Sequence, residues 1–257
     1  MNYTISAVDR ALLLLEALAD SPDCGVSELA LKTGLTKTLI FRLLYTLEER
    51  GFVSKDTVRR TYTLSWRAMI LGDQARRQSK LLSAAEPQMA ELSRVTGCNV
   101  SVQIRDGLNS VTVALQRGTQ EQHIFAEIGR RGPLHAGGGP KVLLAYAPED
   151  IREAVLASDL ARFTPATMIE PDRLREAMSA INRDGWVMSE GELDHSTYSI
   201  AIPIYDSSSQ VAAAMAITGK TDLLPPEKRG HVLDLLREAG VQITRLVGAH
   251  AINTSRV

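Results

Sequence analysis

Residues 27–47, SELALKTGLTKTLIFRLLYTL, constrain the fold of this 257-residue chain more than any other stretch. They predict two helices joined by a tight turn. Ser27 is a suitable N-cap for a first helix over residues 28–33, and Gly34 ends that helix because glycine adopts positive φ without steric cost. Thr36 caps a second helix, whose apolar residues form one stripe: Ile40, Leu43, Leu44 and Leu47. Such a helix pair is typical of a helix-turn-helix, whose second helix enters the major groove of DNA.

A short hairpin is expected directly after this motif. Residues 52–55 and 62–64 are β-prone runs on either side of a polar turn that contains Arg59 and Arg60. The alternative for residues 27–47 alone is an ordinary pair of packed helices in a protein core. A helix-turn-helix followed by a hairpin with a basic tip is typical of a winged helix-turn-helix, so we expect both arginines to contact phosphates or the minor groove.

The second helix carries the candidate DNA contacts, which lie off its apolar stripe: Thr36, Lys37, Thr38, Phe41, Arg42 and Tyr45. Lys37 and Arg42 are suited to a base edge or a phosphate, and the hydroxyl group of Tyr45 is suited to a phosphate. For Phe41 two interpretations remain open. Its ring either meets a thymine methyl group or packs on the hairpin or on the first helix of the chain.

A helix over residues 6–20 is expected to complete the DNA-binding unit. Ser6 and Asp9 have the spacing of a capping box. Four apolar residues recur at helical spacing and are expected to pack on the stripe of the second helix: Val8, Leu12, Leu15 and Ala19. After the hairpin, residues 66–81 contain no proline and predict a linker helix.

The rest of the chain predicts an α+β domain with a largely antiparallel sheet. Six short segments are expected to be strands: 99–104, 110–115, 123–128, 186–189, 199–205 and 211–218. Five segments are expected to be helices: 82–95, 140–146, 148–157, 171–183 and 226–250. Strands that follow one another as hairpins, with helices between the groups, favour this architecture.

Short blocks of sequence resemble the IclR family of bacterial transcriptional regulators. In the first part of the chain the matching blocks are Ser6-Ala7-Val8-Asp9-Arg10-Ala11, Leu29-Ala30, Gly34-Leu35, Lys37-Thr38, Arg42-Leu43-Leu44, Thr46-Leu47, Gly51-Phe52 and Tyr62-Thr63-Leu64. Further on they are Gly132-Pro133-Leu134-His135-Ala136, Lys141, Leu143-Leu144-Ala145, Gly185-Trp186, Glu192, Ile200-Ala201-Ile202-Pro203-Ile204 and Ala212-Ala213-Ala214. This chain departs from the family pattern at Leu39, at Phe41, where the family usually has a polar or basic residue, and at Pro140, where it has glycine.

The resemblance implies a division of the chain and a function. It implies a winged helix-turn-helix over residues 1–65, a linker helix over residues 66–81 and a GAF-like or profilin-like effector-binding and oligomerisation domain over residues 82–257. It also implies a homodimer, or a dimer of dimers, that reads a palindromic double-stranded DNA operator of a catabolic operon. A small organic or aromatic acid bound in the last domain is expected to change operator affinity.

Three consecutive glycines, Gly137, Gly138 and Gly139, mark the expected effector site. Their backbone N–H groups can approach a ligand oxyanion, and a helix that starts at Pro140 adds the positive end of its dipole. The alternative is a flexible loop that only connects a strand to a helix. In family members that bind small carboxylates, facing strands supply polar side chains, and the resemblance implies these at Ser189, Thr197, Ser199 and Thr218. One further position of this set is Ala216, which lacks a hydrogen-bonding side chain and favours a ligand other than a small keto acid.

The sequence contains no motif that predicts catalysis or a cofactor. The glycines are not followed by the GK[ST] of a P-loop, and there is no GxSxG. Cys98, His135, Glu192 and His195 have no recognised ligand spacing, so we expect no enzyme, no metal and no cofactor, with His135 structural and His195 solvated. Two competing functions are a ligand-binding domain with weak enzymatic activity attached to a DNA-binding head, and an architectural DNA binder.

Charge is distributed as expected for a DNA-binding head on an acidic body. Residues 1–80 contain 12 Lys/Arg against 9 Asp/Glu, a net charge of +3, and residues 81–257 contain 17 against 21, a net charge of −4. No segment approaches the roughly 18 apolar residues of a membrane span. The N-terminus lacks the pattern of a secretion signal, and Cys24 and Cys98 form no CxxC motif. We therefore expect a cytoplasmic protein with reduced thiols and no membrane partner.

Overall fold

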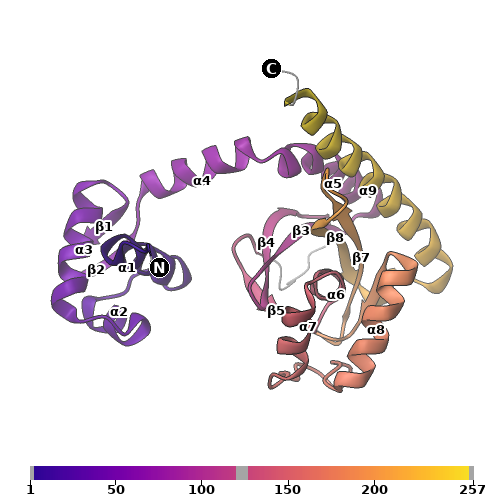
Figure 1. The fold of residues 1–257 in the computed structure, drawn as a ribbon, viewed down its shortest axis with the longest axis horizontal. Helices are drawn as coiled ribbons and strands as arrows, with labels where there is room; N and C mark the ends of the chain where they lie inside the picture. Colours follow the sequence, from indigo (N-terminus) through magenta and orange to yellow (C-terminus); the bar gives the residue numbers. More distant parts are fainter. Residues whose placement is uncertain (1–2, 120–126, 255–257) are drawn as a thin grey trace. The chain divides into compact units, whose positions relative to one another are not determined.

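The computed structural model describes residues 3–119 and 127–254. The chain divides into two compact units, Met1–Ser79 and Lys80–Val257, which we call the head and the body (Figure 1). Among the described helices, none is both long enough and apolar enough to cross a membrane.

The head contains the expected helix-turn-helix and hairpin. Its elements are α1 (Ser6–Asp20), α2 (Val26–Thr33), α3 (Lys37–Glu49), β1 (Val53–Asp56), β2 (Thr61–Leu64) and α4 (Trp66–Gln78). Strands β1 and β2 pair antiparallel, with Val53 opposite Leu64. The three-helix unit and the hairpin share one core, made of Leu14, Leu18, Cys24, Leu29, Ile40, Leu44, Val53 and Tyr62.

The N-caps of the first two helices differ from the prediction. Helix α2 starts at Val26 rather than at residue 28, because the side chain of Glu28 reaches back and accepts a hydrogen bond from the backbone N–H of Gly25 at 2.8 Å. Ser27 therefore lies inside the helix and does not cap it. Helix α1 has no side-chain cap, so the predicted capping box of Ser6 and Asp9 is wrong. Two other caps are as expected: Gly34, the C-cap of α2, has φ +69°, and Thr36, the N-cap of α3, accepts from the N–H of Leu39 at 3.4 Å.

The buried stripe of α1 also differs from the prediction. Leu14 and Leu18 are in the core, whereas Val8 and Leu12 are 53% and 55% exposed. The segment Ala11–Leu15 is apolar on every side of the helix, so its periodicity does not determine which face is buried. Only Leu15 of the four predicted contacts packs against the head core.

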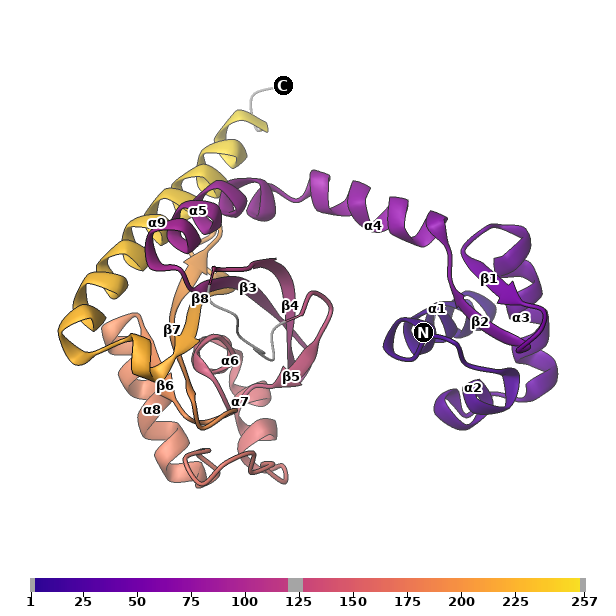
Figure 2. The ribbon, with the colours of Figure 1, turned by 180° about the vertical axis from the view of Figure 1, so that it is seen from behind.

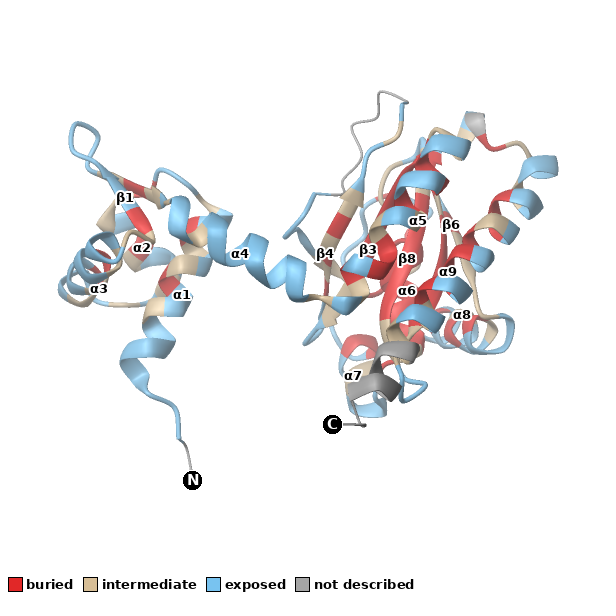
Figure 3. Cartoon of the chain, turned by 90° about the horizontal axis from the view of Figure 1, so that it is seen from above, coloured by how far each residue is buried: buried red, intermediate tan, exposed pale blue. Residues whose placement is uncertain are grey.

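The linker helix predicted over residues 66–81 ends three residues early, and the helix predicted over residues 82–95 starts two residues early. Helix α4 ends at Gln78, Ser79 is extended, and a second helix, α5 (Lys80–Thr96), begins directly afterwards. No residue of α4 is buried (Figure 3), whereas Leu82 of α5 belongs to the core of the body. The change from solvated helix to core helix therefore falls at Ser79.

The body is built on one six-stranded antiparallel sheet in the order β5-β4-β3-β8-β7-β6. The strands are β3 (Asn99–Asp106), β4 (Asn109–Gln116), β5 (Arg131–Pro133), β6 (Val187–Glu190), β7 (Thr197–Tyr205) and β8 (Val211–Lys220). The short β5 was not predicted. The strand expected over residues 123–128 falls largely outside the described residues, and its described end, Glu127 and Ile128, is not in a strand.

Helices cover both faces of this sheet (Figures 1 and 2). On one face, α5 and α9 (Pro226–Thr254) pack on a core that includes Ile200, Ile202 and Ile204 of β7. On the other face, α6 (Gly138–Ala145), α7 (Glu149–Leu156) and α8 (Pro171–Asp184) pack near Ala201 of β7 and two alanines of β8. The α+β class with an antiparallel sheet is thus confirmed.

Candidate functional site

The predicted recognition helix presents its candidate DNA contacts to solvent. All six residues are exposed: Thr36, Lys37, Thr38, Phe41, Arg42 and Tyr45. From Lys37 to Arg42 they cover about 140° of the helix surface, opposite the stripe of Ile40 and Leu44. Phe41 is 54% exposed and does not belong to the head core, so the interpretation that its ring is packed away finds no support.

The hairpin carries Arg59 and Arg60 at an exposed tip. Its turn is held by Asp56, whose Oδ1 accepts from the backbone N–H of Val58 at 2.8 Å and of Arg59 at 3.0 Å. Arg60 has φ +59°. Because its turn is fixed locally, the tip can present both guanidinium groups without contacts from the helices.

The body brings all seven predicted effector residues to one pocket. Gly137, Gly138 and Gly139 stand at the start of α6, and Ser189, Thr197, Ser199 and Thr218 lie on the strands β6, β7 and β8. The pocket encloses about 90 Å³ of space for the centres of water-sized molecules, which is enough for several waters or for a small organic molecule in their place. Sequence reasoning missed five lining residues: Ser101, Gln103, Glu192, Leu193 and Tyr198.

Helix α6 begins at Gly138, two residues earlier than predicted, with Gly137 as its N-cap at φ +91°. The first N–H groups of a helix have no partner within the helix. Here the N–H of Gly137 donates to Glu192 Oε2 at 3.0 Å, and Pro140 has no N–H. Two N–H groups are left, those of Gly138 and Gly139, and neither donates a hydrogen bond within the described residues. They are available to an anion at the positive end of the helix dipole.

These glycines also have a packing role. Gly138 and Gly139 are buried residues of helix α6 and do not form a flexible connecting loop. A Cβ atom at Gly138 would lie 2.8 Å from Ser199 Oγ and 3.1 Å from the Ser199 carbonyl oxygen. A Cβ atom at Gly139 would lie 1.9 Å from Gln103 Oε1. The absence of side chains therefore lets the start of α6 lie directly on strands β3 and β7.

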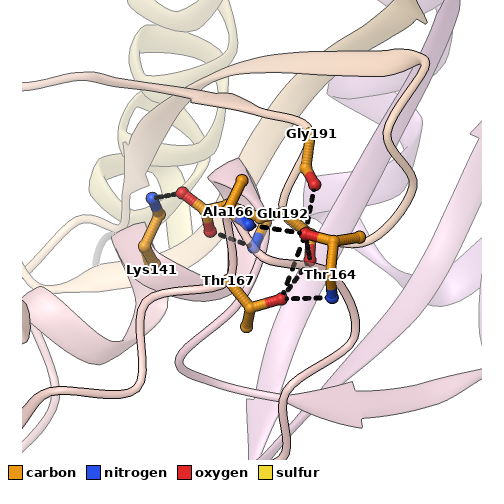
Figure 4. A network of polar contacts seen from close by, with 7 residues as sticks. Lys141, Thr164, Ala166, Thr167, Gly191 and Glu192 are labelled. Carbon is orange, nitrogen blue, oxygen red and sulfur yellow. Dashed lines mark hydrogen bonds and ion pairs between the residues drawn. The ribbon is translucent and has the colours of Figure 1, made fainter.

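A buried ion pair stands behind one wall of the pocket: Glu192 lines the pocket and Lys141 lies behind it (Figure 4). Lys141 Nζ pairs with Glu192 Oε1, and the two side chains are only 3% and 8% exposed. Two threonine side chains fix the backbone around Glu192. Thr167 Oγ1 donates to the Glu192 carbonyl oxygen at 2.7 Å, and Thr164 Oγ1 donates to the Gly191 carbonyl oxygen at 2.6 Å. Both charges are thus neutralised inside the wall, and no unpaired charged side chain is among the lining residues.

The floor of the pocket is a row of hydroxyl groups across three strands. Ser189 of β6 lies opposite Ser199 of β7, and Ser199 lies opposite Thr218 of β8. Thr218 Oγ1 donates to Ser199 Oγ at 3.4 Å. Tyr198, which also borders the pocket, has its hydroxyl group in the core on the other face, 3.2 Å from Cys98 Sγ. Burial there, and the contact with Cys98, raise the pKa of the Tyr198 phenol.

The remaining candidate groups are separate from this pocket. His135 is buried, its Nε2 lies 2.9 Å from the Ala161 carbonyl oxygen, and its ring stacks on Phe163. His195 is exposed, as expected. Within the described part of the chain, no group of three or more His, Cys, Asp or Glu residues is placed to hold a metal ion.

Comparison with known proteins identifies the family. Residues 74–245 match the family model described as bacterial transcriptional regulator IclR C-terminal, and residues 7–57 match the IclR helix-turn-helix domain. The chain belongs to the IclR family. It is 30% identical over 249 residues to the HTH-type transcriptional regulator KipR of Bacillus subtilis, covering 96% of this chain and 99% of KipR.

Solved IclR structures have the same fold. The regulator from Alicyclobacillus acidocaldarius superposes with a TM-score of 0.88 at 22% identity, covering 96% of this chain and all of the other. An IclR homologue from Microbacterium hydrocarbonoxydans, solved in complex with 4-hydroxybenzoate, gives a TM-score of 0.82 at 23% identity, covering 95% and 99%. This IclR protein is therefore a transcriptional regulator with a DNA-binding head and an effector-binding C-terminal domain.

Proposed function

We propose that this IclR regulator controls a catabolic operon through a small organic acid, aliphatic or aromatic, that binds at the start of α6. It acts in the cytoplasm as a homodimer or a dimer of dimers, so that two heads meet the half-sites of a palindromic operator. The acid changes operator affinity because it binds more tightly to one of two arrangements of the regulator.

The pocket is the observation that carries this proposal. The free N–H groups of Gly138 and Gly139 suit the two oxygens of a carboxylate, and the α6 dipole favours the negative charge. The bound 4-hydroxybenzoate of the Microbacterium relative is itself a carboxylic acid. Lys141 and Glu192 neutralise each other, so neither side chain offers a free positive charge to the acid. The backbone N–H groups at the start of α6 are therefore the proposed contacts of its carboxylate.

The head supports the DNA-binding half of the proposal. Lys37 and Arg42 lie on the exposed side of α3, where they can reach base edges and phosphates of the major groove. Arg59 and Arg60 at the hairpin tip are placed for phosphates or the minor groove. Thr36, Thr38, Phe41 and Tyr45 complete the proposed recognition surface.

A thermal-shift screen of the full chain against small carboxylic acids tests the effector half. An acid that binds only the folded state raises the melting temperature in a saturable way. We expect at least one aliphatic or aromatic acid to do so, and the shift at a fixed concentration to shrink in Ser199→Ala. Ser93→Ala is the control, because it also removes the hydroxyl group of a serine in the body but lies outside the pocket. Stabilisation that is equal in both variants would place the acid elsewhere.

A further inference from the structure

Two hydroxyl groups on the pocket floor lack partners, and they point to the chemical class of the ligand. Ser101 and Ser189 are each only 4% exposed and line the pocket, yet neither hydroxyl group makes a hydrogen bond within the described residues. Gln103 Oε1 also has no partner, but it is fully buried and a ligand in the pocket does not reach it. Polar groups inside folded proteins are almost always paired, so the two serines await a bound molecule or ordered water.

Their arrangement follows from the sheet. Ser189, Ser199 and Thr218 form a row across three neighbouring strands, which extends over about 10 Å. Ser101 and Gln103 stand two residues apart on β3, and the adjacent strand contributes only Ala216 opposite Ser101. The polar groups therefore border a central space that is left open by an alanine, beneath the free N–H groups of Gly138 and Gly139.

No aromatic side chain of the pocket is placed to stack on an aromatic ring of a ligand. Among the lining residues the apolar side chains are those of Pro140, Leu193 and Ala216. The one aromatic residue at the pocket, Tyr198, places its phenol in the opposite core, next to Cys98. A planar apolar ring would cover hydroxyl groups without pairing them, which is unfavourable.

We propose that the effector is an aliphatic carboxylic acid with several hydroxyl groups. Its carboxylate accepts from Gly138 and Gly139, and its hydroxyl groups pair with Ser101 and Ser189. A chain of about four to six carbons, with a hydrogen bond at each end, fills the span of the row. This inference rests on the proposed function, because it takes the acid site at α6 and narrows its ligand class.

Isothermal titration of the full chain with matched compounds tests the ligand class. The hydroxy-acid probes are D-gluconate, D-galactonate and L-threonate. Hexanoate keeps the carboxylate without hydroxyl groups, sorbitol keeps the hydroxyl groups without the carboxylate, and 4-hydroxybenzoate supplies an aromatic ring. We expect at least one hydroxy acid to bind about tenfold or more tightly than the other three compounds, since two or more additional hydrogen bonds are made.

Two variants locate the hydroxyl contacts. Ser101→Ala and Ser189→Ala each remove one unpaired hydroxyl group, and we expect each to weaken hydroxy-acid binding about 3- to 10-fold. Binding of hexanoate should not change, and Ser93→Ala, the buried serine outside the pocket, should change neither ligand. A hydroxy acid that binds equally well to all of these variants would overturn the proposed contacts.

The outcomes separate the two proposals. If 4-hydroxybenzoate or hexanoate binds and no hydroxy acid does, the ligand class is wrong and the acid site stands. If sorbitol binds as well as gluconate, the carboxylate anchor is wrong. If none of the compounds binds to the folded chain, both the acid site and its ligand class are overturned.

Discussion

The recognition surface of the head and the pocket of the body are built in opposite ways. The head presents charged and aromatic side chains to solvent, such as Arg42 and Tyr45 on α3. The pocket of the body offers uncharged hydroxyl groups and backbone N–H groups, and the two charges beside it, Lys141 and Glu192, are paired with each other.

This difference predicts a difference in tolerance to mutation. Exposed side chains that contact phosphates contribute separately to DNA affinity. Removing any one of them should therefore lower the affinity modestly and in a salt-dependent way. The pocket depends on close packing and on a buried ion pair, where removal of one partner leaves an uncompensated charge. The largest effects should therefore arise in the pocket wall and the smallest at the hairpin tip.

Lys141→Met should have the largest effect. It leaves the Glu192 carboxylate buried without its cation, and we expect a loss of about 3–5 kcal/mol in the free energy of unfolding. Urea unfolding followed by circular dichroism measures this loss. The double variant Lys141→Met/Glu192→Leu should recover part of it, whereas Arg94→Ala, which removes a fully solvated ion pair with Glu91, should lower the free energy of unfolding far less. A loss below 1 kcal/mol for Lys141→Met would contradict the role of the pair.

Gly138→Ala should be the next most damaging change. The new Cβ atom would lie 2.8 Å from Ser199 Oγ and 3.2 Å from Ala201 Cβ, and would push α6 away from the sheet. We expect a loss of about 1–3 kcal/mol in stability, read from the same unfolding curves. Gly72→Ala in α4 is the control. Nothing lies within 4 Å of its added Cβ atom, so it should stabilise the head by about 0.5–1 kcal/mol. Equal effects of the two changes would show that Gly138 has no packing role.

Arg42→Ala tests the recognition surface of the head. Its side chain is exposed on α3, so the fold should be unaffected while binding to the operator weakens by about 1–3 kcal/mol. Fluorescence anisotropy with an operator selected in vitro measures the affinity. Arg94→Ala in the body should leave operator affinity unchanged. An Arg42→Ala variant that binds as tightly as the wild type would remove α3 from the recognition surface.

Arg59→Ala should have the smallest effect. If the Arg59 guanidinium contacts one phosphate, its removal lowers the slope of log affinity against log salt concentration by about one. The loss should be similar for operator and for unrelated DNA, because a phosphate contact does not read sequence. An unchanged salt slope would mean that the hairpin tip does not touch the backbone of DNA.

Local patterns predicted the elements of the chain well. Gly34 and Thr36 define the turn of the helix-turn-helix, and the hairpin of β3 and β4 follows from alternation around a polar turn. Errors arose where local patterns are ambiguous. The α1 segment is apolar all round, so its sequence does not determine which face is buried. Helix α2 starts before Ser27, because the Glu28 side chain accepts a hydrogen bond from the backbone N–H of Gly25.

The pocket was only partly predictable for a related reason. The glycines are visible as a run in the sequence, and the resemblance implied four of the strand residues. Ser101 and Gln103 were missed because their place beside Ala216 depends on the pairing of β3 with β8, which joins segments far apart in the chain. The pair of Lys141 and Glu192 likewise joins distant segments and leaves no local signal.

Operator binding by the full chain with and without a bound acid tests the central claim most directly. The acid is one that saturates the wild-type pocket by titration, and anisotropy measures the affinity for the selected operator. We expect the acid to change operator affinity at least about fivefold in the wild type. At the same acid concentration, the change should be much smaller in the double variant Ser101→Ala/Ser189→Ala. An operator affinity that stays the same while the acid saturates the wild-type pocket would contradict the account.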